Sequence, residues 1–123
     1  MTDSQAPVSP QAHGPQREFW EERFRARQTP WERGGVHPQL TRWLTDGSLR
    51  PSALNGAIAV PGCGSGHEVA ALAKAGCDVV AIDYAAAAIE LTRQRLIDDR
   101  STAQLVQADV LAWQPSAPLA AVY

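Results

Sequence analysis

The hydrophobic pattern from residue 57 onward predicts an alternation of buried strands and helices. Apolar runs without polar alternation at 57–60, 78–83 and 105–110 are typical of strands buried on both faces of a sheet. Between them, apolar residues recur at helical spacing from about 67 to 75 and from about 85 to 99. This order predicts an α/β domain with a mostly parallel, Rossmann-like sheet and right-handed crossovers.

The N-terminal part of the chain has a different pattern. Residues 1–16 contain almost no large apolar side chain and are expected to form a disordered tail. From residue 17 the chain becomes aromatic, and Trp20 and Phe24 stand four residues apart, on one face of a helix. A stiff loop with Trp31 follows, and then a helix over about 38–45 that ends at Gly47. We therefore expect one domain over 17–123, with an aromatic helical cap over 17–47.

The second expected helix has its own apolar set. Its residues Leu40, Trp43 and Leu44 are predicted to be buried.

The last apolar run, 118–123, predicts the beginning of a fourth strand, which should lie beside the first. We expect this strand to leave an apolar edge of the sheet exposed.

The first strand leads directly into a glycine turn. The turn has the form Gly62-x-Gly64-x-Gly66 and precedes a predicted helix, which together form a pocket for the polar part of a nucleotide-like cofactor. The dinucleotide fingerprint G-x-G-x-x-G has its third glycine one residue later, where this chain has His67. A plain strand-to-helix turn without a ligand is the alternative.

Carboxylates follow the next two predicted strands. Asp83 lies 21 residues after Gly62 (83 − 62), close to the spacing of about 20 expected for an acceptor of ribose hydroxyls. The alternative for Asp83 is a cap for the helix that starts near Ala85. After the third strand, Asp109 is a candidate acceptor for an adenine amino group with Val110 beside the ring, and an ordinary turn aspartate is its alternative.

Composition narrows the function classes. A chain of 123 residues with a net charge of −2 is not expected to bind nucleic acid. The N-terminal arginines alternate with acids such as Glu21 and Glu22, which we interpret as a solvated helix face. No stretch approaches the ~18 apolar residues of a membrane span, and no secretory signal is evident, so the cytoplasm is the expected location. Cys63 and Cys77 lack metal-site spacing, and no metal is expected.

Four motifs together resemble the thiopurine S-methyltransferase family. They are F-W-E-E-R-F at 19–24, T-P-W at 29–31, G-V-H-P-Q-L at 35–40 and V-P-G-C-G-S-G-H-E at 60–68. The T-P-W loop and the P-G-C-G core are similar to the halide/thiol methyltransferase branch. The resemblance covers 17–123 and implies a class I methyltransferase fold with a seven-stranded, mostly parallel sheet and helices on both faces. Only strands one to three and part of the fourth are present, so the chain looks C-terminally truncated.

The resemblance also implies a cofactor, S-adenosyl-L-methionine, and its contacts. The residues that it places around the cofactor are Trp20, Phe24, Trp31, Gly62, Gly64, Asp83, Asp109 and Val110. The chain departs from the family at Ala120, where an aspartate often begins the fourth strand, and at Phe24, where many relatives have tryptophan.

The expected activity is transfer of a methyl group to a small soft nucleophile: a thiol, a thiopurine-like aromatic thiol or a halide. No catalytic residue is assigned, because a thiol nucleophile makes a general base optional. Cys63 between glycines suits packing, and His37, a single histidine before a proline, is a weak candidate for lining the pocket. We expect a monomer when full length, and a 123-residue chain that is marginally soluble and without methyl transfer. The alternatives are a fragment of an NAD-dependent oxidoreductase and a non-catalytic, truncated cofactor-binding fragment.

Overall fold

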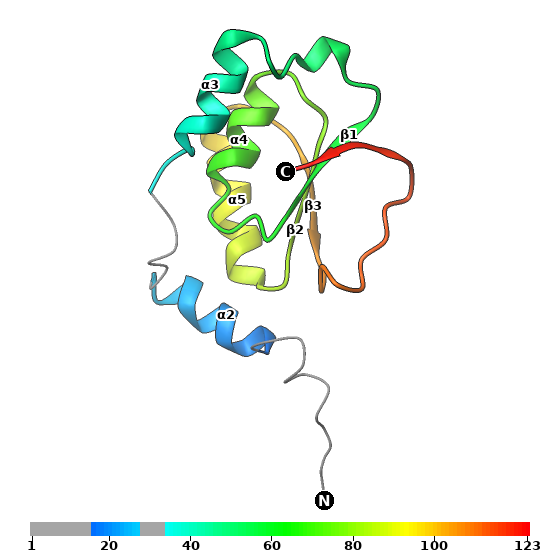
Figure 1. Cartoon of the computed structure of the whole chain (residues 1–123). Coiled ribbons are helices and arrows are strands. Elements are labelled where there is room, and N and C mark those ends of the chain that lie inside the picture. Colours follow the sequence, from blue (N-terminus) through cyan, green and yellow to red (C-terminus); the bar gives the residue numbers. More distant parts are fainter. Residues whose placement is uncertain (1–15, 28–33) are drawn as a thin grey trace, which may run out of the picture.

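A parallel sheet forms the centre of the protein in a computed structural model that describes residues 16–27 and 34–123 (Figure 1). Its strands are β1 (Ala57–Pro61), β2 (Val79–Asp83), β3 (Gln104–Gln107) and β4 (Leu119–Val122). They lie in the order β3-β2-β1-β4, and every neighbouring pair is parallel. The expected position of the first strand between the second and the fourth is confirmed. The predicted disordered tail and Trp31 lie outside the described residues.

The helices follow the predicted pattern closely. They are α2 (Arg17–Arg25), α3 (Pro38–Asp46), α4 (His67–Lys74) and α5 (Ala86–Asp98), with a short 3-10 turn, η1 (Pro51–Ala53), before β1. Helix α3 ends at Gly47, whose φ of 83° is the left-handed conformation that glycine adopts at a helix end. Figure 1 shows α3, α4 and α5 together on one side of the sheet, and α2 beside the start of α5.

The two faces of the sheet are covered differently. On the helical face, Ile58 and Val60 of β1 join the core formed with α3, α4 and α5. On the other face, Ala59 lies with Val80 and Ile82 under the segment 108–118 that connects β3 to β4. Among the described residues, therefore, helices flank one face of the sheet and a loop covers the other.

Strands β1 and β2 carry apolar residues on both faces because both faces of the sheet are covered. All residues of β2 are buried, including Asp83 at its end. Strand β3 is half-buried, and after Gln107 the chain turns away and enters the covering loop. Asp109 therefore follows the strand, as predicted.

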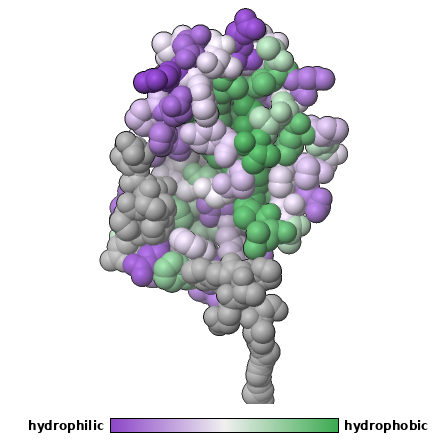
Figure 2. Space-filling view, viewed as in Figure 1, coloured by the Kyte–Doolittle hydropathy of each residue, from purple (hydrophilic) through white to green (hydrophobic). Residues whose placement is uncertain are grey.

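Apolar surface gathers on the side of the covering loop and β4. Figure 2 shows a strip of hydrophobic residues on this view of the molecule. The exposed large apolar residues include Leu111 of the loop and Val122 of β4, which are 66% and 64% exposed. Since β4 is the outermost strand at this end of the described sheet, the expected exposed apolar edge is present.

Candidate functional site

The glycine turn lies at the carboxyl end of β1, where parallel α/β sheets bind ligands. Gly62, Gly64 and Gly66 have φ values of 66°, 58° and 83°, all in the left-handed region that favours glycine. A side chain at Gly62 would meet no atom within 4 Å, so this part of the turn opens to solvent. A side chain at Gly66 would meet Thr92 of α5 at 2.6 Å, so this part is packed. The turn is therefore open to solvent at Gly62 and packed against α5 at Gly66, which we call its open side and its closed side.

Helix α5 holds the closed side of the turn. The Thr92 hydroxyl donates to the Gly64 carbonyl oxygen over 3.0 Å, and the Arg95 Nε donates to the Ser65 carbonyl oxygen over 2.9 Å. Thr92 is completely buried. Both contacts fix the orientation of the turn's peptide groups. The sequence placed Thr92 on the buried helix face, but its role as a donor to the turn was missed, although a lone hydroxyl on an apolar stripe was a signal.

Asp83 connects the turn to the start of α5. Its carboxylate, on a residue only 6% exposed, accepts the Gly64 amide through Oδ2 and the Ala85 amide through Oδ1, each over 3.0 Å. The helix-cap alternative therefore describes one of its two oxygens. A carboxylate has about four lone-pair positions, so these bonds do not exhaust its capacity as an acceptor.

Asp109 forms the turn that follows β3. Its Oδ1 accepts the Leu111 amide over 2.9 Å, and its carbonyl oxygen accepts the Ala112 and Trp113 amides. These contacts are those of the turn aspartate that we gave as the alternative. Val110 beside it is 38% exposed. A contact of Asp109 or Val110 with a cofactor stays a prediction.

The aromatic residues of α2 divide into an anchor and a surface. Phe24 is 5% exposed and packs with Ala85 and Ala88, so its ring forms the contact between α2 and α5. Trp20 is half-buried against the same group, and its ring stands edge-on to Phe19 with ring centroids 5.1 Å apart. The shared helix face of Trp20 and Phe24 is confirmed, while Phe24 is placed as a packing residue.

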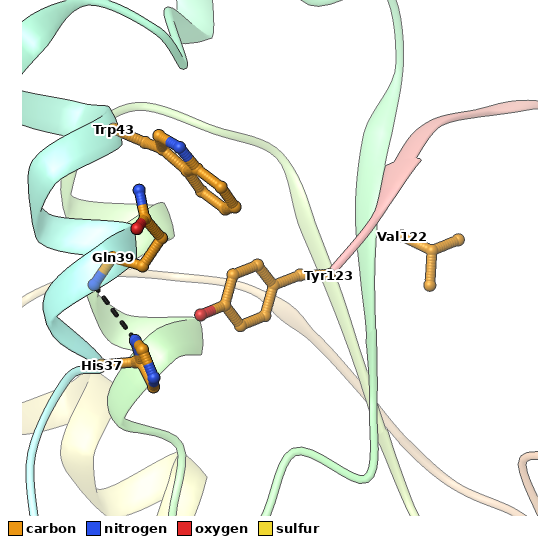
Figure 3. A pocket seen from close by; sticks show the side chains of 5 residues that line it. All are labelled: His37, Gln39, Trp43, Val122 and Tyr123. Carbon is orange, nitrogen blue, oxygen red and sulfur yellow. Dashed lines mark hydrogen bonds between the residues drawn. The ribbon is translucent and has the colours of Figure 1, made fainter.

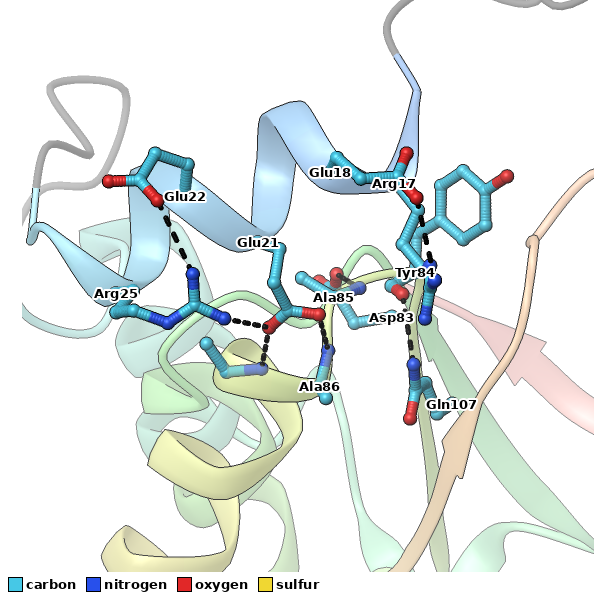
Figure 4. A network of polar contacts seen from close by, with 11 residues as sticks. Arg17, Glu18, Glu21, Glu22, Arg25, Asp83, Tyr84, Ala85, Ala86 and Gln107 are labelled. Atoms are coloured by element: carbon cyan, nitrogen blue, oxygen red, sulfur yellow. Dashed lines mark hydrogen bonds and ion pairs between the residues drawn. The ribbon is translucent and has the colours of Figure 1, made fainter.

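Glu21 corrects the interpretation of α2 as a solvated face. Its carboxylate accepts the backbone amides of Ala86 and Ala87 at the start of α5 (Figure 4). The side chain is 16% exposed, whereas that of Glu22 is 70% exposed and pairs with Arg25. Glu21 stands three residues before Phe24, and this spacing, which puts both on one face, was the signal that the sequence offered.

A hollow of about 380 Å³ lies between the start of α3 and the end of β4 (Figure 3). It is lined by His37, Gln39, Trp43, Val122 and Tyr123. The His37 Nδ1 accepts the Gln39 amide and caps α3. Trp43 is 40% exposed at the rim, so its predicted burial was wrong, whereas Leu40 is buried in the core and Leu44 packs half-buried against it. Burial and the charge of Glu68 raise the pKa of the Tyr123 hydroxyl.

The two cysteines are buried and pack against their surroundings. The Cys63 Sγ lies 3.6 Å from the Thr92 hydroxyl, on the closed side of the turn. Burial and the neighbouring Asp78 raise the pKa of the Cys77 thiol, which disfavours its thiolate. Across residues 16–27 and 34–123, no three His, Cys, Asp or Glu side chains are grouped to hold a metal ion. No helix in this same part is long and apolar enough to cross a membrane.

A parallel sheet in the order 3-2-1-4, a glycine turn after β1 and a buried carboxylate at the end of β2 define a Rossmann-like α/β domain, a class of fold that commonly binds nucleotide cofactors. Residues 15–123 match the family model described as thiopurine S-methyltransferase. The chain belongs to the thiopurine S-methyltransferase family.

Curated relatives are similar over part of their length. Probable thiol methyltransferase 2 from Arabidopsis thaliana is 30% identical over 99 residues, which make up 79% of this chain and 42% of that protein. Thiocyanate methyltransferase 1 from Brassica oleracea is 31% identical over the same shares of the two chains. The chain thus spans less than half the length of these relatives.

Solved structures share the fold. Magnesium protoporphyrin IX methyltransferase from Synechocystis, solved with bound S-adenosylmethionine, superposes with a TM-score of 0.66 at 16% identity, over 90% of this chain and 60% of that one. A structure solved in work on the conversion of a disulfide bond into a thioacetal group in echinomycin biosynthesis has a TM-score of 0.63 at 26% identity, over 76% and 39% of the two chains. The expected class I methyltransferase fold is confirmed.

Proposed function

We propose that the protein is an S-adenosylmethionine-dependent methyltransferase whose acceptor is a small soft nucleophile. The observation that carries this proposal is the Asp83 carboxylate, buried at the base of the glycine turn and bonded to the Gly64 amide. This arrangement puts an acceptor for a ribose diol beside a backbone segment that a ligand can approach closely. Family membership and the names of the curated relatives support the same function.

The described residues fit S-adenosylmethionine. A side chain at Gly62 would fill space that is empty here, so the missing side chain leaves room for the methionine part of a ligand. Asp83 would accept the ribose hydroxyls, and Asp109 would accept from the adenine amino group. Trp20, with Trp31 outside the described residues, would cover the cofactor and exclude water. When bound, the cofactor supplies a methyl group on a positively charged sulfonium.

The chain's own contribution is binding and orientation rather than proton transfer. Aromatic faces stabilise a desolvated cation by ~0.5–2 kcal/mol. An alkyl thiol with a pKa of about 8.5 is already a few per cent thiolate at pH 7, so a general base is not required. The residues need only hold two reactants in line and keep water away. We therefore assign no catalytic residue.

Charge at the start of α4 favours this reading over a dinucleotide oxidoreductase. A dinucleotide places its pyrophosphate at the first helix N-terminus of the fold. Here Glu68 stands in the first turn of α4, and its carboxylate accepts the His37 amide over 3.0 Å. A fixed carboxylate at this terminus repels a pyrophosphate, whereas it is compatible with a cationic sulfonium.

The acceptor class is drawn from the relatives. The names of the curated relatives specify a thiol and thiocyanate, both soft sulfur nucleophiles. We propose the same class for this protein, together with aromatic thiols and halides. We also propose that the protein is a monomer and that it is located in the cytoplasm.

We predict that the full-length protein converts small thiols, thiocyanate or iodide to their methyl derivatives in the presence of S-adenosylmethionine. Mass spectrometry of the methylated product and of S-adenosylhomocysteine, in equal amounts, is the measurement. Alcohols and amines of matched size serve as controls, because they are hard nucleophiles and are expected to be unreactive. Transfer to the alcohols or amines but to none of the soft nucleophiles would contradict the proposed acceptor class.

A further inference from the structure

Glu21 satisfies backbone donors on an element 65 residues away in the chain. Its Oε2 accepts the Ala86 amide over 3.0 Å and its Oε1 accepts the Ala87 amide over 2.6 Å. Figure 4 shows the Glu21 carboxylate of α2 pointing at the first turn of α5. An ionised acceptor makes such bonds stronger than a neutral one, and the short distances agree with this.

The first turn of α5 depends on acceptors from outside the helix. A helix leaves its first four amides without partners in the helix itself. Ala85 at the N-cap position has no polar side-chain atom that could accept a hydrogen bond from them. Asp83 accepts the Ala85 amide, and Glu21 accepts the next two. Three consecutive amides are thus bonded to two carboxylates, which also oppose the positive end of the helix dipole.

The first turn of α5 also holds Asp83, which is part of the proposed cofactor site. Asp83 bonds the glycine turn with one oxygen and the start of α5 with the other. A shift of the first turn of α5 therefore moves the acceptor for the ribose. Apolar contacts bind α2 to the same place, since Phe24 packs on Ala85 and Ala88 with Trp20 beside it.

We propose that Glu21 is a positioning residue, which fixes the first turn of α5 and with it Asp83 and the aromatic face of α2 for cofactor binding. This inference rests on the proposed function. Glu21 acts through the backbone of Ala86 and Ala87 and through the docking of α2. Its Arg25 partner, at 3.9 Å and exposed, adds little to this.

The neighbouring Glu22 provides a matched control. It stands on the same helix with the same charge, but its side chain is 70% exposed and pairs with Arg25 at 3.3 Å. Replacing Glu22 changes the net charge and the helix propensity of α2 as much as replacing Glu21. A difference between the two variants therefore reports on the contact with α5.

The test measures binding of S-adenosylhomocysteine by calorimetry to full-length wild type, Glu21→Ala, Glu21→Gln and Glu22→Ala, well below each melting temperature. We expect Glu21→Ala to weaken binding by about 10-fold or more, since two charge-assisted hydrogen bonds are lost. Glu21→Gln keeps one oxygen acceptor and is expected to weaken binding by about 3-fold to 10-fold. Glu22→Ala is expected to bind within about 2-fold of wild type.

Other outcomes have distinct meanings. If Glu21→Ala melts earlier but binds like wild type, Glu21 only stabilises the fold and the inference is wrong, while the proposed function stands. If Glu21→Ala does not fold, the comparison of Glu21→Gln with Glu22→Ala decides, and equal affinities would overturn the inference. If wild type itself does not bind S-adenosylhomocysteine, the proposed function fails first and the inference falls with it.

Discussion

Asp83→Ala is expected to weaken binding of S-adenosylhomocysteine to the full-length protein by about 1.5–3 kcal/mol, the range for hydrogen bonds to a charged group. This corresponds to roughly 10- to 150-fold in the dissociation constant. The reason is that Asp83 is the buried carboxylate at the base of the glycine turn, where a ribose diol needs an acceptor. Calorimetric titration of both proteins is the measurement.

The control for this prediction is an aspartate at the opposite end of the same strand. Asp78 precedes β2 and is exposed, so Asp78→Ala should leave the affinity unchanged. Asp83→Ala also removes the acceptor of the Gly64 and Ala85 amides, so thermal unfolding is followed in parallel. An Asp83→Ala protein that is folded and binds with wild-type affinity would reduce Asp83 to a structural link between the turn and α5.

Gly66→Ala is expected to lower the stability of the fold more than Gly62→Ala does. A left-handed conformation costs a residue with a side chain ~1–2 kcal/mol, and Gly66 has a φ of 83°. The added Cβ would also lie 2.6 Å from the Thr92 hydroxyl and 2.9 Å from the Thr92 Cα. Because the Cα belongs to the backbone of α5, a rotamer change cannot remove the clash, and overpacking adds ~1–3 kcal/mol. We expect the free energy of unfolding to fall by about 2–5 kcal/mol.

Gly62→Ala separates the two causes. Gly62 has a similar φ of 66°, but its added Cβ would meet nothing within 4 Å. Only the cost of the left-handed conformation applies, and the free energy of unfolding is expected to fall by about 1–2 kcal/mol. Urea denaturation of wild type and the two variants gives the comparison. Equal losses for Gly62→Ala and Gly66→Ala would show that packing of the turn against α5 is not the reason for the third glycine.

Elements whose signals are local were predicted well. The buried strands β1 and β2 were visible because both faces are covered, which removes polar alternation. The stripe of α5 was visible because Ala88, Ile89 and Leu96 repeat at the helical period and are buried. The left-handed Gly47 at the end of α3 was visible from residue type alone.

Features that depend on tertiary contacts were predicted less well. The contact of Glu21 with α5 joins residues 65 positions apart. The spacing to Phe24 puts Glu21 on the inner face of α2, but it does not identify the backbone amides that the carboxylate meets. Trp43 was placed in the core by its period, but α3 packs through Leu40 and leaves Trp43 at the rim of a hollow. Periodicity gives the face of a helix, while the depth of each residue depends on what the face meets.

The candidate site was predicted in outline. The glycine turn and Asp83 come together as expected, because parallel strands end at the same edge of the sheet. The donors that fix the turn, Thr92 and Arg95, were not predicted. The lone hydroxyl of Thr92 on an apolar stripe was a signal, but spacing does not identify the backbone carbonyl to which a distant side chain donates. Phe24 packs against α5, and its predicted role as an aromatic cover of the cofactor stays a prediction.

The central claim is that the glycine turn and Asp83 bind the adenosine and amino acid parts of S-adenosylmethionine rather than a dinucleotide. Parallel calorimetric titrations of the full-length protein with S-adenosylhomocysteine and with NAD test this most directly. The account predicts saturable binding of S-adenosylhomocysteine at one site per chain and no measurable binding of NAD at the same concentrations. Saturable binding of NAD, with no heat from S-adenosylhomocysteine, would contradict it.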